Sequence, residues 1–467
     1  MRRLHRLTLA VACFAASSMA FASEPTQDDA LIAKGKYLAI AADCGACHTA
    51  PEHGKPMAGG YAINSPLGDI IASNITPSKT AGIGNYSEED FARSVRQGIN
   101  KEGTHLYPAM PYTSYAKISD EDIHALYAYF MHGVEPVDEP VAETQLPFPF
   151  NLRFAMAGWN LFFADNQTFT PSTEASAEIN RGDYLVNALA HCDTCHTPRN
   201  ALMGQNNDHA LSGGSLGSWY APNITPDQES GIGSWSEQQL AQYLKTGHVA
   251  GKAQAAGPMA EAVEHSLQYL SDDDIAAMVA YLRQVPAVNT GKGPSRDSLG
   301  QPSTDEMTQR GLGKEADAGW QVFSSTCANC HQADGRGTDQ YPSLFHNTTT
   351  GADRADNLIA TIVFGVHRTV NGEAIAMPSF GPDADWTERL TDQQIADVAN
   401  YVFKTFGNSE LSVTPEQVKV VREGGEKPLI AQLAQPLPMT IIVIVLLAIV
   451  ITVIRGLSRG KKNATAK

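Results

Sequence analysis

Three similar segments carry apolar residues at helical spacing, and each begins with a hydroxyl residue followed by acidic or amide side chains. Such a Ser or Thr caps a helix, and acidic side chains in the first turn complement the helix dipole. The pattern predicts helices at residues 119–130, 271–282 and 391–403. Further helical stretches lie upstream of these, at residues 34–41, 181–190 and 318–325. A chain of 467 residues with this pattern is expected to form three mainly helical units with few strands.

Two of these units are duplicates. The tetrapeptide Asn-Ile-Thr-Pro occurs at residues 74–77 and again at 223–226, an offset of 149, and Gly-Ile-Gly recurs at the same offset, at 82–84 and 231–233. The third unit lacks both motifs, so we expect it to be a divergent relative of the other two.

The repeats and the segments between them predict the domain boundaries. We expect domains at residues 30–135, 178–286 and 313–408. Segments rich in Pro, Gly and charge predict linkers at 135–146, 287–312 and 409–436. Residues 148–163 are too aromatic for a solvated linker, and we expect them to pack between domains or against a partner.

The first 22 residues have the order of parts found in a secretory signal peptide. Arg2, Arg3 and Arg6 precede an apolar stretch at 7–21, and Ala20-Phe21-Ala22 has the small-x-small form of a cleavage site. The alternative is a short buried helix that stays on the protein. We expect export, with cleavage after Ala22.

A second apolar block spans residues 437–454, carries no charge and is followed by basic residues. A helix of this length is long enough to span a bilayer, and the basic flank would place the C-terminal tail in the cytoplasm. A buried core helix is the alternative. The predicted fold class is therefore all-α, with three tandem domains and a C-terminal transmembrane helix.

The net charge excludes one class of partner. It is −16 for the whole chain, and it becomes −24 once the three Arg of residues 1–22 and the five basic residues behind residue 454 are removed. Nucleic-acid binding needs a basic face, so we expect no nucleic-acid partner. An acidic surface steers basic partners, although solubility alone explains it equally well.

Six of the seven cysteines form three Cys-x-x-Cys-His motifs, and the seventh, Cys13, lies in the predicted signal segment. This is the form of c-type haem attachment, in which two thiols bind the haem vinyl groups and the histidine binds the iron. Disulfides, redox pairs and half zinc sites also use paired cysteines, but none of them explains the adjacent histidine. Three covalently bound haem c groups are predicted, at Cys44, Cys47 and His48, at Cys192, Cys195 and His196, and at Cys327, Cys330 and His331.

Each unit also offers a second iron ligand. Electron carriers commonly hold the iron between histidine and methionine, which leaves no open position for a substrate. Met110, Met259 and Met377 each lie beside a proline in a predicted loop shortly before the closing helix. Other methionines are expected to be core filler. Histidine is an equally good ligand, so the competitors are His105, His248, His265 and His367.

Together these motifs resemble a known family, the triple-haem cytochrome c subunits of bacterial membrane-bound dehydrogenases for alcohol, gluconate, sorbitol and fructose. The likeness covers nearly the whole chain and includes Met110-Pro111-Tyr112 and Met377-Pro378-Ser379-Phe380. It implies a complex on the periplasmic side of the inner membrane. In such a complex a separate catalytic subunit oxidises the substrate, and the haems pass its electrons to ubiquinone or a terminal oxidase.

The sequence contains no dinucleotide fingerprint, no nucleophile constellation and no metal triad outside the predicted haem sites. We therefore expect a subunit that is not catalytic on its own. Two alternatives stay open: a cytochrome that feeds a terminal oxidase directly, and a self-contained haem enzyme in which one iron lacks its sixth ligand.

Overall fold

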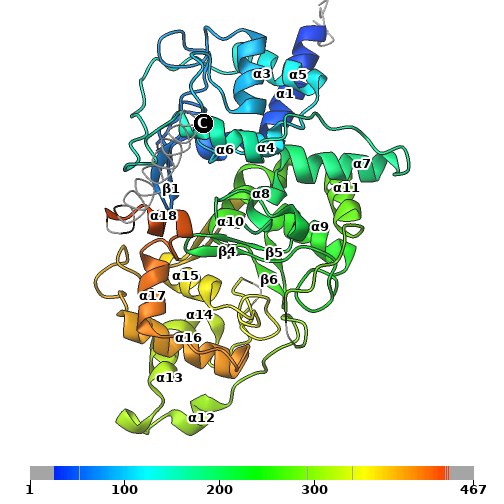
Figure 1. The fold of residues 1–467 in the computed structure, drawn as a ribbon. Coiled ribbons are helices and arrows are strands. Elements are labelled where there is room, and N and C mark those ends of the chain that lie inside the picture. Colours follow the sequence, from blue (N-terminus) through cyan, green and yellow to red (C-terminus); the bar gives the residue numbers. More distant parts are fainter. Residues whose placement is uncertain are drawn as a thin grey trace, which may run out of the picture.

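The computed structural model describes residues 26–51, 53–291, 293–338 and 340–436, with residues 438 and 440. The chain forms three helical units in sequence order, with the first at the top of Figure 1, the second in the middle and the third at the bottom. The predicted signal segment at 1–22 lies outside the described residues.

The first unit contains five helices and one hairpin. Its helices are α1 (Gln27–Ala41), α2 (Cys44–His48), α3 (Glu88–Gln97), α4 (Tyr112–Tyr115) and α5 (Asp120–His132), and its strands are β1 (Ala62–Ser65) and β2 (Gly68–Ile71). The side chain of Ser119 caps α5, as predicted, by accepting a hydrogen bond from the backbone N–H of Asp122.

The second unit repeats this order with additions. Its helices are α7 (Ala177–Tyr184), α8 (Cys192–His196), α9 (Glu237–Thr246), α10 (Gly257–His265) and α11 (Asp272–Leu282). A π-helical turn at Leu185–Leu189 links α7 to α8, and short 3₁₀ turns lie at Asn207–His209 and Leu267–Tyr269. Two small hairpins pair β3 (Gly214–Leu216) with β4 (Trp219–Ala221), and β5 (His248–Val249) with β6 (Ala253–Gln254).

The third unit follows the linker that contains α12 (Asp305–Gln309) and a 3₁₀ turn at Gly313–Glu315. It comprises α13 (Ala318–Val322), a π-helical turn (Phe323–Cys327), α14 (Ala328–His331), α15 (Asp356–Phe364), β7 (Val366–Val370), β8 (Glu373–Met377) and α16 (Asp392–Phe406). The predicted linker at 409–436 is partly helical, because it contains α17 (Pro415–Arg422) and α18 (Leu429–Leu433).

In each unit the helix before the cysteine motif crosses the closing helix: α1 crosses α5, α7 crosses α11, and α13 crosses α16. A glycine makes the close approach possible. A Cβ atom added at Gly182 would lie 2.0 Å from the carbonyl oxygen of Ala277, and one added at Gly35 would lie 1.9 Å from that of Ala125. The predicted helices at 119–130, 271–282 and 391–403 are confirmed as α5, α11 and α16.

The prediction of an all-α fold is wrong, because the described residues contain four two-stranded antiparallel sheets. The longest hairpin, β7–β8, turns at Asn371 and Gly372, which both have positive φ values (52° and 81°). Asn-Gly between alternating buried and exposed residues is a strong hairpin signal, so this strand pair was open to prediction.

The predicted transmembrane helix is also corrected. Within the residues that the structure describes, no helix is both long and apolar enough to cross a membrane. Of the predicted span at 437–454, only residues 438 and 440 are described.

The aromatic segment at 148–163 contains α6 (Ala155–Phe163). It packs between the first two units, which is one of the two predicted alternatives. The ring of Trp159 meets that of Tyr112 edge to face at 6.4 Å, and its indole N–H donates to the carbonyl of Leu202 at 2.9 Å. The outer side of α6 leaves Leu161 and Phe162 exposed.

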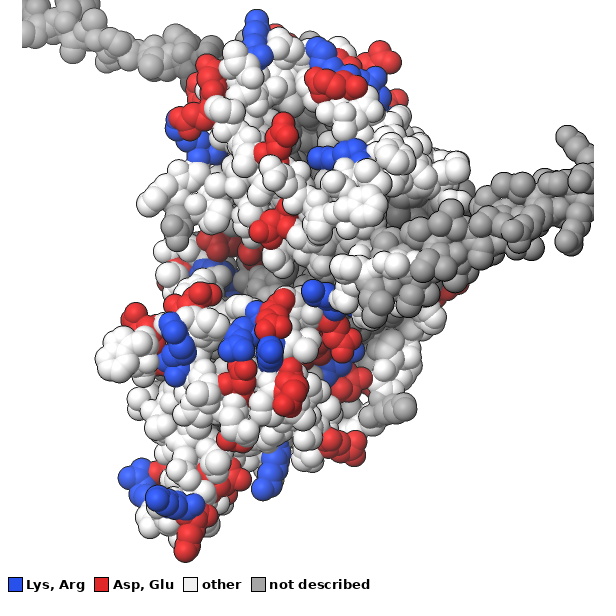
Figure 2. All heavy atoms as spheres, turned by 60° about the vertical axis from the view of Figure 1, so that its left-hand side comes forward, with Lys and Arg blue, Asp and Glu red and all other residues white. Residues whose placement is uncertain are grey.

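The first and second units share one hydrophobic core, whereas the third has its own. The third unit joins the second through apolar and polar contacts: Val370 of β7 packs into the shared core, and Trp219 of β4 packs against the core of the third unit. The side-chain amide of Asn357 bonds the backbone N–H and carbonyl of Tyr220, both at 2.9 Å, and Arg368 donates to the carbonyls of Thr246 and Ala255. On the face drawn in Figure 2, basic side chains lie among the acidic ones, so the excess negative charge does not gather into one patch there.

Candidate functional site

Each predicted cysteine pair lies on a single helical turn that ends at its histidine. The turns are α2, α8 and α14, the last with Cys327 as its N-cap residue. Because residues three apart lie on the same side of a helix, the two sulfur atoms of each pair face the same way. Both thiols can therefore bind one planar group.

All six cysteines in these turns are free thiols and are partly buried. Burial raises the pKa of Cys44, Cys47, Cys192 and Cys327 to about 12, and that of Cys195 to about 11. A redox-active Cys-x-x-Cys pair needs a lowered thiol pKa, so these turns do not have the electrostatics of a redox site. Among the described residues no group of three or more His, Cys, Asp or Glu is placed to hold a metal ion.

The three motif histidines are oriented alike. In each, the ring Nδ1 lies within hydrogen-bond distance of a backbone carbonyl, which leaves Nε2 free to bind a metal. Burial lowers the pKa of all three, and that of His196 to about 4, so each ring is neutral at pH 7 and Nδ1 is the donor. The pairs are His48 with Ser73 (2.7 Å), His196 with Pro222 (2.6 Å) and His331 with Pro342 (3.0 Å).

The Asn-Ile-Thr-Pro motif explains why two of these carbonyls are in place. Ser73 and Pro222 directly precede its two copies. The Asn223 oxygen accepts hydrogen bonds from the backbone N–H and hydroxyl of Thr225, and its amide donates to the carbonyl of Val288 at 2.6 Å. Asn74 makes the same contacts to Thr76 and Val137. The motif is thus a turn tied to the following linker, and it positions the histidine, a role that sequence reasoning missed.

In the second unit the structure brings all four predicted site residues to one cavity of about 670 Å³, lined by Cys192, Cys195, His196 and Met259. Its walls are mainly apolar, with Leu240, Leu244 and Leu282 among them. This volume falls within the usual range for ligand cavities, and the combination of an apolar wall with a few polar groups is typical of a cofactor site.

Met259 lies in the first turn of α10 rather than in the predicted loop. Pro258 directly before it fits an early helix position, where no N–H donor is needed. Met377 ends strand β8, whereas Met110 lies in a loop, as predicted.

In the other two units the predicted ligands border a core. Met110 and Cys44 are half-buried against the shared core, and Met377 and Cys327 are half-buried against the core of the third unit.

The competing histidines are placed differently. His265 and His367 are exposed, and the Nδ1 atom of His248 lies 2.6 Å from the side chain of Gln254. His105 lies 3.3 Å from the amide of Asn160. Neither His248 nor His265 lines the cavity of the second unit, whereas Met259 does.

Two further cavity residues come from the positions just before the first cysteines. Asp43 and His191 both have positive φ values (52° and 38°), and both line the second-unit cavity. The ring of His191 meets that of Tyr115 at 5.5 Å, and the hydroxyl of Tyr115 donates to the carbonyl of Ala42 at 2.5 Å, so the first two attachment turns lie close together. Sequence reasoning missed both residues, since only the packing of two units brings them to one cavity.

These donors fit a c-type haem. The cavity offers two sulfur atoms on one helical turn, an imidazole whose Nε2 is free, and the thioether of Met259. This is the donor set by which c-type cytochromes hold haem iron.

Comparison with known proteins agrees with this chemistry. The family model of cytochrome c matches the chain three times, at residues 32–133, 179–286 and 316–405. Each match contains one of the cysteine motifs.

Several curated proteins are similar along most of their length. The fructose dehydrogenase cytochrome subunit of Gluconobacter japonicus is 49% identical, over 89% of this chain and 88% of the relative. The gluconate 2-dehydrogenase cytochrome c subunit of Pantoea cypripedii is 41% identical, over 87% and 92%. The cytochrome c subunit of the quinone alcohol dehydrogenase of Gluconobacter oxydans (strain 621H) is 39% identical, over 82% and 80%.

Proposed function

This chain belongs to the cytochrome c family, and from that premise we propose that it is the electron-transfer subunit of a dehydrogenase complex. Its relatives are cytochrome subunits of fructose, gluconate and alcohol dehydrogenases. The chain passes electrons from a catalytic dehydrogenase subunit to the respiratory chain. Oxidation of the substrate belongs to the partner.

The chain carries three haems in this proposal. Domains at 30–135, 178–286 and 313–408 each bind one through a cysteine pair: Cys44 and Cys47, Cys192 and Cys195, or Cys327 and Cys330. The iron ligands are His48 with Met110, His196 with Met259, and His331 with Met377. When bound, each haem supplies a one-electron redox centre.

The observation that carries this proposal is the second-unit cavity, which gathers Cys192, Cys195, His196 and Met259. The chain's own residues hold the imidazole in one orientation through the carbonyl of Pro222, and they line the cavity with apolar side chains. A haem iron held by both His196 and Met259 would have no open position for a substrate, which favours electron transfer over haem-based catalysis.

We propose that the complex works in the periplasm, at the inner membrane, with ubiquinone or a terminal oxidase as the acceptor. The signal-like residues 1–22 support export. The relatives suggest an alcohol, a sugar or a sugar acid as the partner's substrate.

The haem count is tested by mass spectrometry and haem absorbance of the purified full chain. We expect three haems in the native protein and two in a Cys192→Ser, Cys195→Ser variant. Ala328→Ser, Asn329→Ser is the matched control, because it places two serines in an attachment turn and keeps both cysteines, and it should keep three haems. Fewer than three haems in the native protein would contradict the assignment.

The partner is tested by purifying the complex through a tag after Lys467 and adding ethanol, gluconate or fructose in turn. One of these substrates should reduce the haems, as seen in the absorbance spectrum. A purified complex whose haems stay oxidised with every alcohol, sugar and sugar acid, or that instead turns over peroxide, would refute the dehydrogenase assignment.

A further inference from the structure

Arg296 enters the second-unit cavity from the linker between the second and third units. It lines this cavity together with His196, Asn223 and Tyr243. One guanidinium nitrogen donates to the carbonyls of Asn223 (3.3 Å) and Gly231 (3.5 Å). Its Nε is fully buried and has no hydrogen-bond partner within the described part of the chain.

The neighbouring residue fixes the linker at this point. The carboxylate of Asp297 pairs with Lys252 at 2.6 Å and accepts a hydrogen bond from the hydroxyl of Ser234 at 2.9 Å. On the other side, a Cβ atom added at Gly351 would lie 1.8 Å from the carbonyl oxygen of Arg296, so the third unit presses directly on the linker. Contacts from two units therefore hold Arg296 at the cavity wall.

The charge of Arg296 lacks a counterion. Among the described residues it makes no ion pair within 4.0 Å, and the nearest carboxylate in sequence, that of Asp297, is already engaged by Lys252. A partly buried guanidinium with a buried, unpaired Nε is costly unless it is paired, and two weak carbonyl contacts do not compensate a full charge. Arginine pairs best with a carboxylate, through two parallel hydrogen bonds.

We propose that Arg296 binds a propionate carboxylate of the haem held at Cys192 and Cys195, and so raises the reduction potential of that haem. The inference rests on the proposed function, because it requires a haem in the second unit. Ferric haem carries one more positive charge than ferrous haem. A nearby guanidinium therefore disfavours the oxidised form.

The linker that follows the first unit has no counterpart of Arg296. This linker, at 135–146, contains no Lys or Arg and four acidic residues: Glu135, Asp138, Glu139 and Glu143. The duplicated units thus differ in the charge that their linkers bring to the haem site. This difference gives two otherwise similar haems distinct potentials.

The test is a spectroelectrochemical titration of the full-length complex with an Arg296→Gln substitution. We expect the equilibrium constant for reduction of one haem to fall about tenfold. This corresponds to a midpoint potential lower by about 59 mV for a one-electron couple, while the other two haems keep their midpoint potentials. Arg296→Lys should lower this midpoint potential by less, because lysine keeps the positive charge but not the forked geometry of the guanidinium.

Arg368→Gln is the matched control. Arg368 is a buried arginine at the same junction, it donates to two backbone carbonyls, and it does not line the cavity. This variant should lower stability and leave all three midpoints unchanged.

Different results would overturn the Arg296 inference and the proposed function. If Arg296→Gln keeps three attached haems and all three midpoints stay as in the native protein, the inference is overturned. That outcome is expected if Asp353, which also lines the cavity, is the true partner of Arg296. Absence of a haem from the native second unit would instead refute the proposed function, and haem counting separates the two.

Discussion

The hydroxyl of Tyr37 in the first unit donates a 2.6 Å hydrogen bond to the carboxylate of Asp274 in the second. A matching hydrogen bond links the units the other way round: the hydroxyl of Tyr184 in the second unit donates to the carboxylate of Asp122 in the first at 2.7 Å. Each tyrosine lies on the helix before a cysteine motif, and each aspartate lies in the first turn of a closing helix. The duplicated units therefore pack like the two halves of an isologous dimer. Asp43 and His191, which directly precede the two cysteine motifs, line one cavity in this arrangement.

Removal of these hydroxyls should weaken the junction. A hydrogen bond to a charged group contributes about 1.5–3 kcal/mol, so Tyr37→Phe and Tyr184→Phe should each lower the free energy of unfolding by an amount of that order. Urea unfolding followed by circular dichroism measures the effect. Tyr269→Phe is the control, because Tyr269 is 59% exposed, and it should leave stability unchanged. If Tyr37→Phe and Tyr184→Phe are as stable as the native protein, the reciprocal hydrogen bonds do not stabilise the junction.

The junction should also respond to acid. Burial raises the pKa of Asp274, but the hydrogen bonds from Arg181 and Tyr37 outweigh it, so that the pKa lies below its ordinary value of 3.8. A carboxylate with a depressed pKa stabilises the fold above its unfolded-state pKa, and this contribution is lost as pH falls through the folded-state value. The stability difference between the native protein and Asp274→Asn should be largest near neutral pH and shrink below pH 3.8. A difference that is constant with pH would contradict this.

The crossing of α7 with α11 depends on Gly182. A methyl group there would meet the carbonyl oxygen of Ala277 at 2.0 Å and the Cβ of Tyr281 at 2.7 Å, so the helices must separate. Overpacking of this kind typically costs about 1–3 kcal/mol, and Gly182→Ala should lower the free energy of unfolding by at least that amount. Gly158→Ala in α6 is the control, because nothing lies within 4 Å of the added methyl group. It should leave stability unchanged or raise it slightly, since Ala favours helices.

Local signals predicted the closing helices well. The closing helices start where Ser119, Ser271 and Thr391 cap them, because capping depends on residues within one turn of the cap. The β7–β8 hairpin had a local signal too, at Asn371 and Gly372, and it was missed because the haem motifs favoured an all-helical fold.

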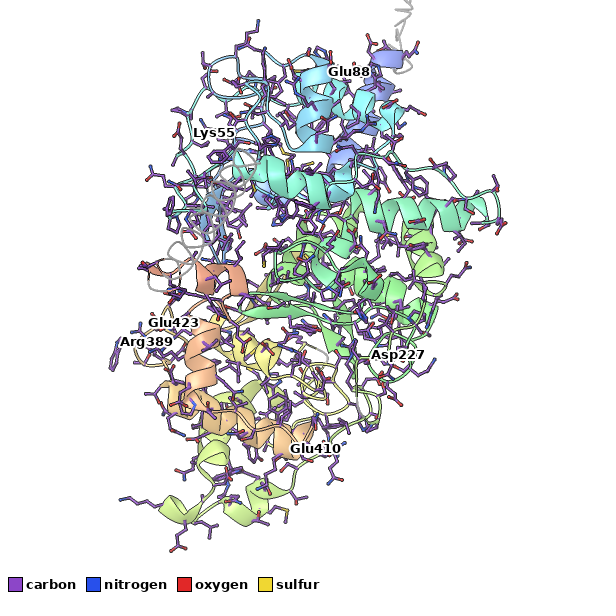
Figure 3. All side chains as sticks on the ribbon, in the orientation of Figure 1. Lys55, Glu88, Asp227, Arg389, Glu410 and Glu423 are labelled. Atoms are coloured by element: carbon purple, nitrogen blue, oxygen red, sulfur yellow. The ribbon has the colours of Figure 1, made fainter. Side chains whose placement is uncertain are left out.

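Long-range features were not open to such reasoning. The carbonyl of Pro222 meets His196 across 26 residues, and Arg296 reaches the cavity from a segment that composition identifies only as a linker. Glu410, which follows the closing helix of the third unit in sequence, also lines this cavity; Figure 3 labels it below Asp227. Such contacts arise from the packing of whole units, which no local pattern encodes.

The assignment of Met259 can be tested against a second methionine of the same cavity. Met278 on α11 also lines it and is fully buried, so both thioethers are close enough to be considered as ligands. Methionine ligation raises the potential of a haem and keeps its iron six-coordinate.

Met259→Leu should therefore give one high-spin haem of lowered potential, visible in the ferric absorbance and electron paramagnetic resonance spectra. Met278→Leu should keep three low-spin haems and cost less than about 1.5 kcal/mol of stability, as near-isosteric core changes do. The reverse outcome would transfer the ligand role to Met278 and place the sixth ligand on the closing helix.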